Sequence, residues 1–314
     1  MEIIMKSSLQ HTIKKSIKLI GVGLHTGKEI ELVIKPAPAN SGIRFVRKDI
    51  NPQVFIPARL EHIVDVHFAT TIGVENIRVS TVEHLMSAFA GANIDNAIVE
   101  LTGPEVPACD GSAYTFFTFL KKAGKLAQEK PRHYMKIIRP VTVSEGERFI
   151  SIEPSDELAV TLEIDFKHPL IARQKFSGVI NEQTFKKEIA RARTFGFLKD
   201  VEMMQANGLA LGGSLDNAVV LTESSIVNEE GLRFPDEFVK HKVLDLIGDL
   251  YLAGMPIIGH VKGFKSGHSL HAKLLKTIFK NSDSYKIIEK EKPSLKKAFW
   301  ARFNKRASEA VAHF

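Results

Sequence analysis

The sequence predicts an α+β protein built from two similar units. At 314 residues, the chain is too long for one ordinary hydrophobic core. Strand patterns followed by a helix pattern occur twice along it, and the segment ERFISIEPS in the second half is similar to KEIELVIKPA in the first. These observations indicate a duplicated unit. Two such units packed face to face would place a ligand site between them.

The first unit, expected over residues 1–130, combines short strands with a helix. Alternating apolar residues bounded by turn residues predict strands at 27–37, 41–49 and 54–60. From 80 to 96 the apolar residues recur every three or four positions, which predicts a helix that ends near Gly91 and Asn93. A buried strand is expected to follow at 97–101.

The second unit, expected over 131–280, follows a charged linker at 121–134 and repeats the same order. The patterns predict a strand meander, a long helix that ends at glycine and a further strand, at 136–166, 234–254 and 256–264 respectively. Residues 281–314 are expected to form a separate basic tail that contains the single tryptophan.

Composition indicates a soluble globular protein of a reducing compartment. The chain is 44% hydrophobic and 25% charged, as globular domains are. No apolar run approaches the roughly 18–20 residues that span a bilayer, and the N-terminal segment lacks the apolar region of a secretory signal. The single Cys109 excludes an intramolecular disulfide, so we expect a cytoplasmic protein.

The net charge of +7 does not indicate a nucleic-acid partner. Residues 281–314 hold eight Lys/Arg and four Asp/Glu, so about half of the excess lies in the tail. The rest lacks the arginine-rich runs and aromatic ladders of nucleic-acid modules, and we expect no nucleic-acid binding. The tail fits a helix on an anionic membrane surface, which would give a peripheral membrane contact, a helix packed on the body of the protein, or a partly disordered end.

Polar residues recur at helical spacing in HKVLDLIGDL, residues 241–250. On a helix, His241, Asp245 and Asp249 lie within roughly 80° of one another. They form either a solvated polar face or the wall of a cavity. His241 and Asp245, at i and i+4, are close enough to share a metal ion, and a catalytic zinc would need one further protein ligand.

Glu83 and His84, near the start of the helix expected at 80–96, permit two interpretations. In one, His84 binds a metal and Glu83 is the base that reaches a water on it. In the other, Ser80 and Glu83 form an S-x-x-E capping box, in which the glutamate bonds back to the backbone at the helix start.

His268 follows Gly267 between an expected strand and an expected helix. It either projects into a cleft or is an ordinary turn residue, and Asp249 could hold one nitrogen of its ring and keep the ring protonated. His271, three residues further on, is either a ligand or a residue that caps the helix.

Together, several motifs resemble those of a known family. In chain order they are GVGLHTGK, TVEHLMSAFAG-x-x-IDN, PEVP with CDGSA, RARTFGF, GLALGGSLDNA, LRFPDEFVKHKVLDLIGDL and KSGHSLHAKLL. From about residue 10 to about 278 the chain resembles the bacterial UDP-3-O-acyl-N-acetylglucosamine deacetylases. The resemblance implies zinc-dependent hydrolysis of the substrate's N-acetyl group, the committed step of lipid A synthesis. It also implies two α+β domains whose helices pack between two outer sheets, and a monomer.

The resemblance also implies roles for individual residues. One Zn²⁺ per chain, with Fe²⁺ as the alternative, would be bound by His84, His241 and Asp245. The catalytic residues would be Glu83, His268, Asp249 and Thr194. Glu83 is the expected base. His268 would be an acid or electrostatic stabiliser held by Asp249, and Thr194 would help to hold the oxyanion. Substrate would contact Lys242, Phe195 and Phe166, and an insert at about 194–223 would enclose the acyl chain.

Two positions depart from the family pattern, and two other classes of protein fit parts of it. His271 stands where asparagine is expected, and Cys109 where an aliphatic residue is expected. A non-haem Fe(II) oxygenase uses the same two-histidine, one-carboxylate set, but it would place the set on a β-barrel. A non-catalytic sugar-nucleotide or lipid-binding protein would not need Glu83 beside a ligand.

Overall fold

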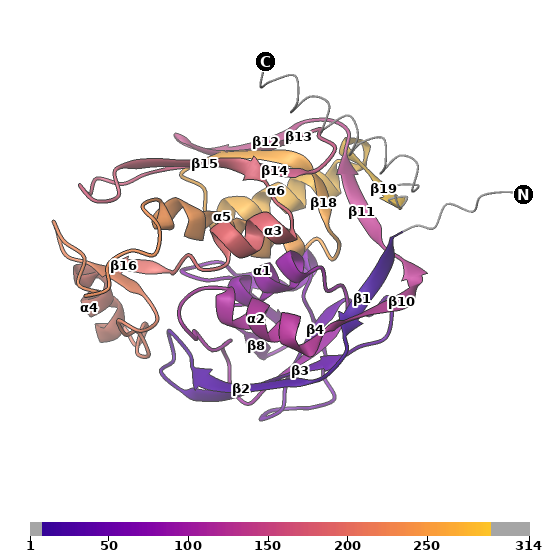
Figure 1. Ribbon diagram of the computed structural model, residues 1–314, viewed down its shortest axis with the longest axis horizontal. Coiled ribbons are helices and arrows are strands. Elements are labelled where there is room, and N and C mark those ends of the chain that lie inside the picture. Colours follow the sequence, from indigo (N-terminus) through magenta and orange to yellow (C-terminus); the bar gives the residue numbers. More distant parts are fainter. Residues whose placement is uncertain (1–7, 290–314) are drawn as a thin grey trace, which may run out of the picture.

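The computed structural model describes residues 8–289, in which helices lie between two sheets (Figure 1). The first sheet has, in spatial order, the strands β2 (Ile17–Val22), β3 (Glu29–Pro36), β9 (Ala97–Leu101), β4 (Ile43–Arg47) and β5 (Ile56–Pro57). The second sheet contains, in spatial order, β12 (Val141–Glu145), β13 (Arg148–Glu153), β18 (Ile257–Phe264), β14 (Leu158–Asp165) and β15 (Arg173–Val179).

The two sheets share one topology. The central strands β9 and β18 each pair antiparallel with the strand on one side, β3 or β13, and parallel with the strand on the other, β4 or β14. The similar segments KEIELVIKPA and ERFISIEPS therefore occupy equivalent strands, β3 and β13. The predicted α+β fold of two similar units with helices between outer sheets is confirmed.

Each central strand lies between two helices in the chain. In the first unit these are α1 (Glu83–Ala92) and α2 (Tyr114–Ala123), and in the second α5 (Glu237–Tyr251) and α6 (His268–Lys280). The expected meander at 136–166 is wrong in one respect. Strand β18 lies between β13 and β14, so these consecutive strands are not neighbours in the sheet.

The remaining strands either extend the second sheet or form small sheets of two or three strands. The charged segment at 121–134 contains β10 (Lys125–Pro131), which pairs with β1 (Leu9–Ile13). Strand β11 (His133–Ile137) pairs with β18 and with β19 (Tyr285–Glu289), so residues assigned to the tail from the sequence extend the second sheet. Short elements complete the described chain: η1 (Leu60–His62), β6 (Ile63–Asp65), β7 (Thr71–Val74), β8 (Ile77–Val79), α3 (Glu182–Thr184), η2 (Phe185–Ile189), β16 (Phe195–Phe197), α4 (Leu198–Ala206), β17 (Val219–Leu221) and η3 (Ser282–Ser284).

No helix among residues 8–289 is long and apolar enough to cross a membrane. The segment expected at 194–223 corresponds to β16, α4 and β17, which project from one side of the layers (Figure 1). The aromatic and basic part of the expected tail, residues 290–314, lies outside the described residues.

Helix α1 begins three residues after the start of the pattern at 80–96 and ends at Ala92, close to the expected end, which has a clear cause. Asn93 adopts the left-handed conformation, with φ of 56°, which terminates the helix as expected. Gly91 does not mark the end. It lies within the helix, and glycine is needed there because a Cβ would come within 2.2 Å of Cδ1 in the buried ring of Phe185. The strand expected at 54–60 is reduced to Ile56–Pro57.

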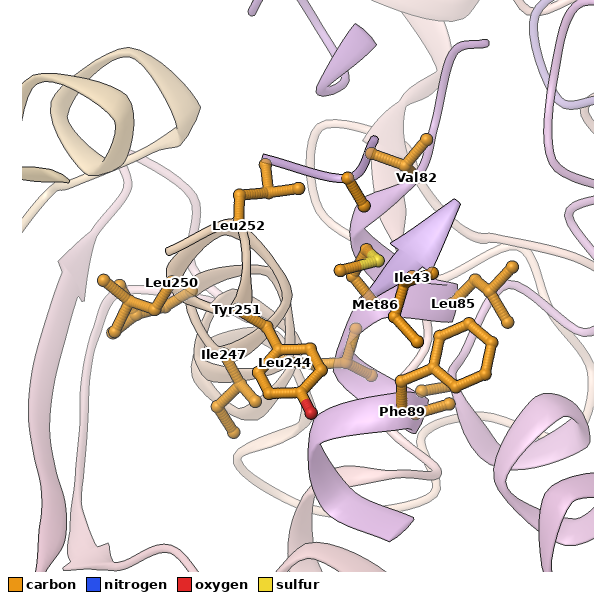
Figure 2. Packing of buried hydrophobic residues seen from close by; sticks show 14 of the residues in the cluster. Ile43, Val82, Leu85, Met86, Phe89, Leu244, Ile247, Leu250, Tyr251 and Leu252 are labelled. Atoms are coloured by element: carbon orange, nitrogen blue, oxygen red, sulfur yellow. The ribbon is translucent and has the colours of Figure 1, made fainter. Parts of the chain in front are cut away.

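Helices α1 and α5 form the centre of the core (Figure 2). Leu85, Met86 and Phe89 of α1 and Leu244 and Ile247 of α5 are almost completely buried. The two helices approach so closely that a Cβ at Gly248 would lie 2.0 Å from the carbonyl oxygen of Glu83. Because backbone occupies that space, only glycine fits at position 248 without a shift of one helix.

We therefore expect Gly248→Ala to destabilise the protein. The added methyl group must push α1 away from α5, and overpacking of this kind typically costs about 1–3 kcal/mol. Denaturant unfolding followed by circular dichroism would measure the loss. The control is Gly196→Ala, where the nearest atom, Val201 Cγ2, is 3.4 Å away, and we expect a change within about 0.5 kcal/mol. Equal effects of the two substitutions would contradict the close-approach argument.

Candidate metal centre and catalytic site

His84 of α1 and His241 and Asp245 of α5 meet where the two helices cross. One ligand atom from each residue lies within 4.8 Å of the others. The Nε2 atoms of both histidines are 3.4 Å from Asp245 Oδ1, and the two rings meet edge to face with centroids 5.0 Å apart. All three side chains are buried, so the alternative of a solvated polar face on the helix at 241–250 is wrong.

The hydrogen-bonding state of the three residues suits a cation. His241 Nδ1 is 3.1 Å from the carbonyl oxygen of Ala192, which can only accept, so Nδ1 carries the proton and Nε2 offers a lone pair. Burial lowers the pKa of His241 to about 3 against the opposing charge of Asp245, so its ring is neutral. Asp245 Oδ1 is buried, and no hydrogen-bond donor among residues 8–289 reaches it. Two imidazoles and one carboxylate oxygen are a donor set that zinc accepts.

Lys242 reaches the same carboxylate from the next position on α5. Its Nζ donates to Asp245 Oδ2 at 2.9 Å, so one oxygen of this carboxylate is paired and the other faces the histidines. Burial would lower the pKa of Lys242, but Asp245 outweighs it and raises the pKa. Burial alone would raise the pKa of Asp245, yet His241 and Lys242 hold it well below its usual range. Asp245 is therefore ionised.

Glu83 is buried beside His84 in the first turn of α1 and does not act as a cap. Its Oε2 accepts a hydrogen bond from the backbone N–H of Thr70 at 3.1 Å. The backbone N–H of Ser80, the expected capping partner, donates instead to the carbonyl of Pro104. The capping-box interpretation is therefore wrong. Burial raises the pKa of Glu83, although the nearby His268 and His84 oppose the shift.

Asp249, one turn after Asp245, holds His268 of α6. His268 Nδ1 donates to Asp249 Oδ2 at 2.7 Å, and Thr70 Oγ1 donates to Asp249 Oδ1 at 2.6 Å. Burial favours the neutral ring, but the charge and hydrogen bond of Asp249 outweigh it and raise the pKa of His268 to about 9. The other ring nitrogen, Nε2, is 3.9 Å from Glu83 Oε1. A protonated imidazole and a carboxylate thus stand side by side next to the histidine cluster.

Thr194 is held in the segment just before β16. Its backbone N–H donates to the carbonyl of Gly111, and its carbonyl accepts from the N–H of Val219. Gly111 has φ of 76°, and a Cβ there would lie 1.9 Å from the carbonyl oxygen of Asn217. The motif CDGSA therefore needs glycine at this position, because it brings the first unit against the segment that contains Thr194.

Arg193, next to Thr194, forms a buried ion pair with Glu237 at the start of α5. Its backbone N–H and its Nε both donate to Glu237 Oε1 at 2.9 Å, and both side chains are almost inaccessible. Arg193 Nη1 reaches the exposed Glu230. This ion pair joins the segment of Thr194 to the helix that carries His241.

Phe195, Phe166 and Lys242 form one group beside His241. The ring of Phe195 packs against Phe166 with centroids 5.7 Å apart and lies 6.3 Å from the ring of His241. Lys242 Nζ lies 5.6 Å from the centre of the Phe195 ring. The three residues that the resemblance implied for substrate therefore lie together, adjacent to the histidine cluster.

A cavity of about 680 Å³ opens between Phe166 and the segment at 194–223. Its apolar lining includes Phe166, Phe197, Leu198 and Leu221, and charged residues such as Lys167 and Lys199 line other parts. A cavity of this size and mixed lining suits a ligand with a polar and an apolar portion.

The sequence analysis missed two features of the site, Thr70 and the Arg193–Glu237 ion pair, and left the role of His271 undecided. Thr70, which bonds both Glu83 and Asp249, follows an irregular segment without a pattern that marks it. The Arg193–Glu237 pair was also missed, although an acidic residue in the first turn of a helix is a weak signal. His271 neither caps α6 nor joins the cluster around Asp245, but it forms a hydrogen bond with Asp249.

Burial raises the pKa of the Cys109 thiol to about 12, so that residue is an inert packing group.

Fold and site together define a class of protein. It is a duplicated α+β protein with a buried candidate metal centre built by one helix from each unit, beside a glutamate and a protonated histidine. Residues 10–280 match the family model described as LpxC: UDP-3-O-acyl N-acetylglycosamine deacetylase. The chain belongs to this family.

Similar proteins cover almost the whole chain. A UDP-3-O-acyl-N-acetylglucosamine deacetylase of Myxococcus xanthus (strain DK1622) is 48% identical over 279 residues, 89% of each chain. One of Syntrophus aciditrophicus (strain SB) is 48% identical over 276 residues, 88% of each chain. One of Shewanella sp. (strain ANA-3) is 46% identical over 286 residues, 90% of this chain and 94% of the relative.

We expect the Arg193–Glu237 ion pair to support both the fold and the placement of α5. Glu237→Gln leaves the buried Arg193 without its counter-charge, and breaking such a pair typically costs about 3–5 kcal/mol of unfolding free energy. Denaturant titration would measure this loss. Glu230→Gln is the matched control, because it removes the exposed partner of the same guanidinium and solvent screens that pair. A loss at Glu237 no larger than that at Glu230 would contradict the interpretation.

Proposed function

We propose that the protein hydrolyses the N-acetyl group of UDP-3-O-acyl-N-acetylglucosamine to give UDP-3-O-acyl-glucosamine and acetate, the committed step of lipid A biosynthesis. The observation that carries this proposal is the placement of Glu83 beside the His84, His241 and Asp245 cluster, with the protonated His268 opposite. Family membership and the names of the relatives support the substrate.

The proposed cofactor is one Zn²⁺ per chain, with Fe²⁺ as the alternative metal of the same site. His84, His241 and Asp245 would hold the ion. The buried Asp245 Oδ1, to which the described part of the chain offers no hydrogen-bond donor, supports this assignment. When bound, such an ion supplies a Lewis acid that polarises the amide carbonyl and acidifies water. A non-haem Fe(II) oxygenase is not supported, because the three candidate ligands lie on helices rather than on a β-barrel.

In the proposed mechanism Glu83 is the general base. Its raised pKa suits a group that takes up a proton at neutral pH, and the backbone N–H of Thr70 fixes one oxygen, which leaves the other free to face the reacting water. As the water attacks the acetyl carbon, Glu83 accepts its proton. A purely binding protein would have no use for an ionisable carboxylate buried at this point.

Protonated His268 and Thr194 are proposed to stabilise the oxyanion that develops on the acetyl group. A single well-placed donor to such an oxyanion is typically worth about 2.7–4 kcal/mol. Asp249 acts through His268, because it keeps the ring protonated and holds Nε2 on the side of the ring near Glu83, 3.9 Å from Oε1. Collapse of the tetrahedral intermediate breaks the C–N bond, and the amine takes a proton either from His268 or from the Glu83 carboxyl group.

The substrate is proposed to lie across the group formed by Lys242, Phe195 and Phe166. Lys242 offers a positive charge to the sugar-phosphate, and the aromatic rings offer stacking surfaces. The acyl chain would pass beside the segment at 194–223, where Phe197, Leu198 and Leu221 supply the apolar part of the cavity lining. Since both units of one chain contribute to the site, the proposal treats the enzyme as a monomer. A nucleotide-linked substrate and a single cysteine support a cytoplasmic location.

Substitutions of two adjacent residues should separate the base from the metal ligands. Glu83→Ala removes the base and should lower turnover by roughly 10²–10⁴-fold while the metal content stays unchanged. His84→Ala should lower the metal content itself. Deacetylase assays on UDP-3-O-acyl-N-acetylglucosamine, together with metal analysis after dialysis, would measure both. If Glu83→Ala kept full specific activity, or lost the metal as His84→Ala does, the assignment of the base would be wrong.

The raised pKa of His268 leads to a prediction for pH dependence. If the protonated ring is required, kcat/KM falls as the pH rises through about 9. Asp249→Asn removes the charge that raises the pKa of His268, so burial is less opposed and the alkaline limb should move to lower pH. The shift also contributes stability that is fully present below 6.5 and is lost as the pH rises through about 9. An alkaline limb that does not move in Asp249→Asn would contradict this role of Asp249.

A further inference from the structure

His271 shares Asp249 with His268. It lies one turn further along α6 and is completely buried. Its Nδ1 is 2.7 Å from Asp249 Oδ2, the same oxygen that accepts from His268 Nδ1 at 2.7 Å. Because an ionised carboxylate only accepts hydrogen bonds, both rings must carry a proton on Nδ1. A single oxygen of Asp249 therefore receives two imidazole N–H groups.

The other nitrogen of His271 fixes the orientation and the charge of its ring. His271 Nε2 is 3.2 Å from Ser266 Oγ, and a neutral ring with its proton on Nδ1 can accept a hydrogen bond from that hydroxyl. Burial lowers the pKa of His271, although Asp249 opposes the shift, so the ring is neutral where His268 is charged. The two histidines thus make the same contact in different charge states.

We propose that His271 is a positioning residue that holds the carboxylate of Asp249 in place and limits how strongly that carboxylate retains the ring proton of His268. The observation behind it is the shared oxygen Oδ2, with Thr70 Oγ1 fixing Oδ1 at 2.6 Å. Asp249 is clamped from both sides, so it cannot turn away from His268. The inference rests on the proposed function only in that the proton of His268 is used in catalysis.

The direction of the effect follows from the hydrogen bonds to Asp249. Each donor to a carboxylate stabilises its negative charge and weakens its attraction for any one neighbouring proton. The N–H of His271 therefore draws on the same lone pairs that hold His268. Without that N–H, Asp249 pairs with His268 alone on this oxygen, and His268 should keep its proton to a higher pH.

Other charges around the two rings come from α1 and α5. Glu83, Asp245 and Asp249 are the carboxylates whose charges act on His268, and Asp245 and Asp249 act on His271. Further elements pack on α6, namely η1, β12, β13 and η3. Within the described part of the chain, no hydrogen bond or ion pair joins either ring to the titratable residues of these elements, which are Glu61, His62, Glu145, Arg148, Glu153 and Asp283.

Two substitutions at 271 distinguish the hydrogen bond from the space that the ring fills. His271→Leu removes the donor and keeps an apolar group in the buried position. His271→Asn is the matched control, because its amide nitrogen is attached to Cγ as Nδ1 is and can make the same hydrogen bond to Asp249. His271→Met is a second donor-free variant in case the leucine variant does not fold.

The test follows the titration of His268 by long-range ¹H–¹⁵N NMR on the metal-loaded protein, together with the pH profile of kcat/KM. In His271→Leu we expect both to move to higher pH by about half a unit or more, a roughly threefold larger protonated-to-neutral ratio at a given pH. In His271→Asn we expect both to stay close to wild type. The NMR titration needs no substrate, so an inactive wild type would contradict the proposed function and still leave this comparison valid.

Two results would overturn the inference. A His271→Leu protein that loses thermal stability while the titration of His268 stays unchanged or moves to lower pH would show that His271 only fills space. Equal shifts in His271→Leu and His271→Asn would show that the hydrogen bond to Asp249 is not the cause. In the wild type, ¹⁵N shifts that place the proton of neutral His271 on Nε2 would contradict the shared oxygen.

Discussion

The close approach of α1 to α5 is the contact on which the rest of the structure depends. At Gly248 the two helices come near enough that no side chain fits between them, and the backbone pressed against that glycine belongs to Glu83. The same contact therefore fixes the separation between the residues at the start of α1 and the polar face of α5. Apolar side chains such as Phe89 and Leu244 hold the crossing, so packing energy from the core determines the geometry of the polar cluster.

This arrangement buries charge, and the way the charge is balanced explains the state of each group. Glu83, Asp245 and Asp249 are three carboxylates in one buried region. Lys242 pairs with Asp245 and His268 pairs with Asp249. The pKa of each of these two carboxylates is lowered. His268 Nε2 lies 3.9 Å from Glu83 Oε1, but burial of Glu83 outweighs the effect of that charge and raises the pKa of Glu83. Different partners thus give neighbouring carboxylates different protonation behaviour, which suits the roles proposed for Glu83 as a base and for Asp245 and Asp249 as ionised groups.

Periodicity was enough to predict the duplicated order and the central helices and strands of each half, because burial of one face of an element imposes a regular spacing of apolar residues. It also placed His241, Asp245 and Asp249 on one face of a helix. It could not bring His84 to them, since that contact depends on how two distant helices cross, and only the family resemblance supplied it. Gly91 illustrates a different limit. Its residue type suggested a helix end, whereas the packing of Phe185 demanded glycine within the helix. The hydrogen-bond partners of Asp249 could not be predicted for the same reason. Thr70, which donates to Asp249, lies far from it in the sequence and is brought to it only by the tertiary fold.

The spacing of the two aspartates on α5 converts helix geometry into the layout of the site. Four residues of α-helix rise about 6 Å, so Asp245 and Asp249 face the same side one turn apart. The carboxylate of Asp245 faces His84 and His241, and the carboxylate of Asp249 faces His268. Glu83, from the opposite helix, lies beside both His84 and His268. The proposed reaction would need a base, a cation and a proton donor within a few ångströms of one another. The pair of helices α1 and α5 places the candidate base and the candidate metal ligands, and α6 adds His268 beside them.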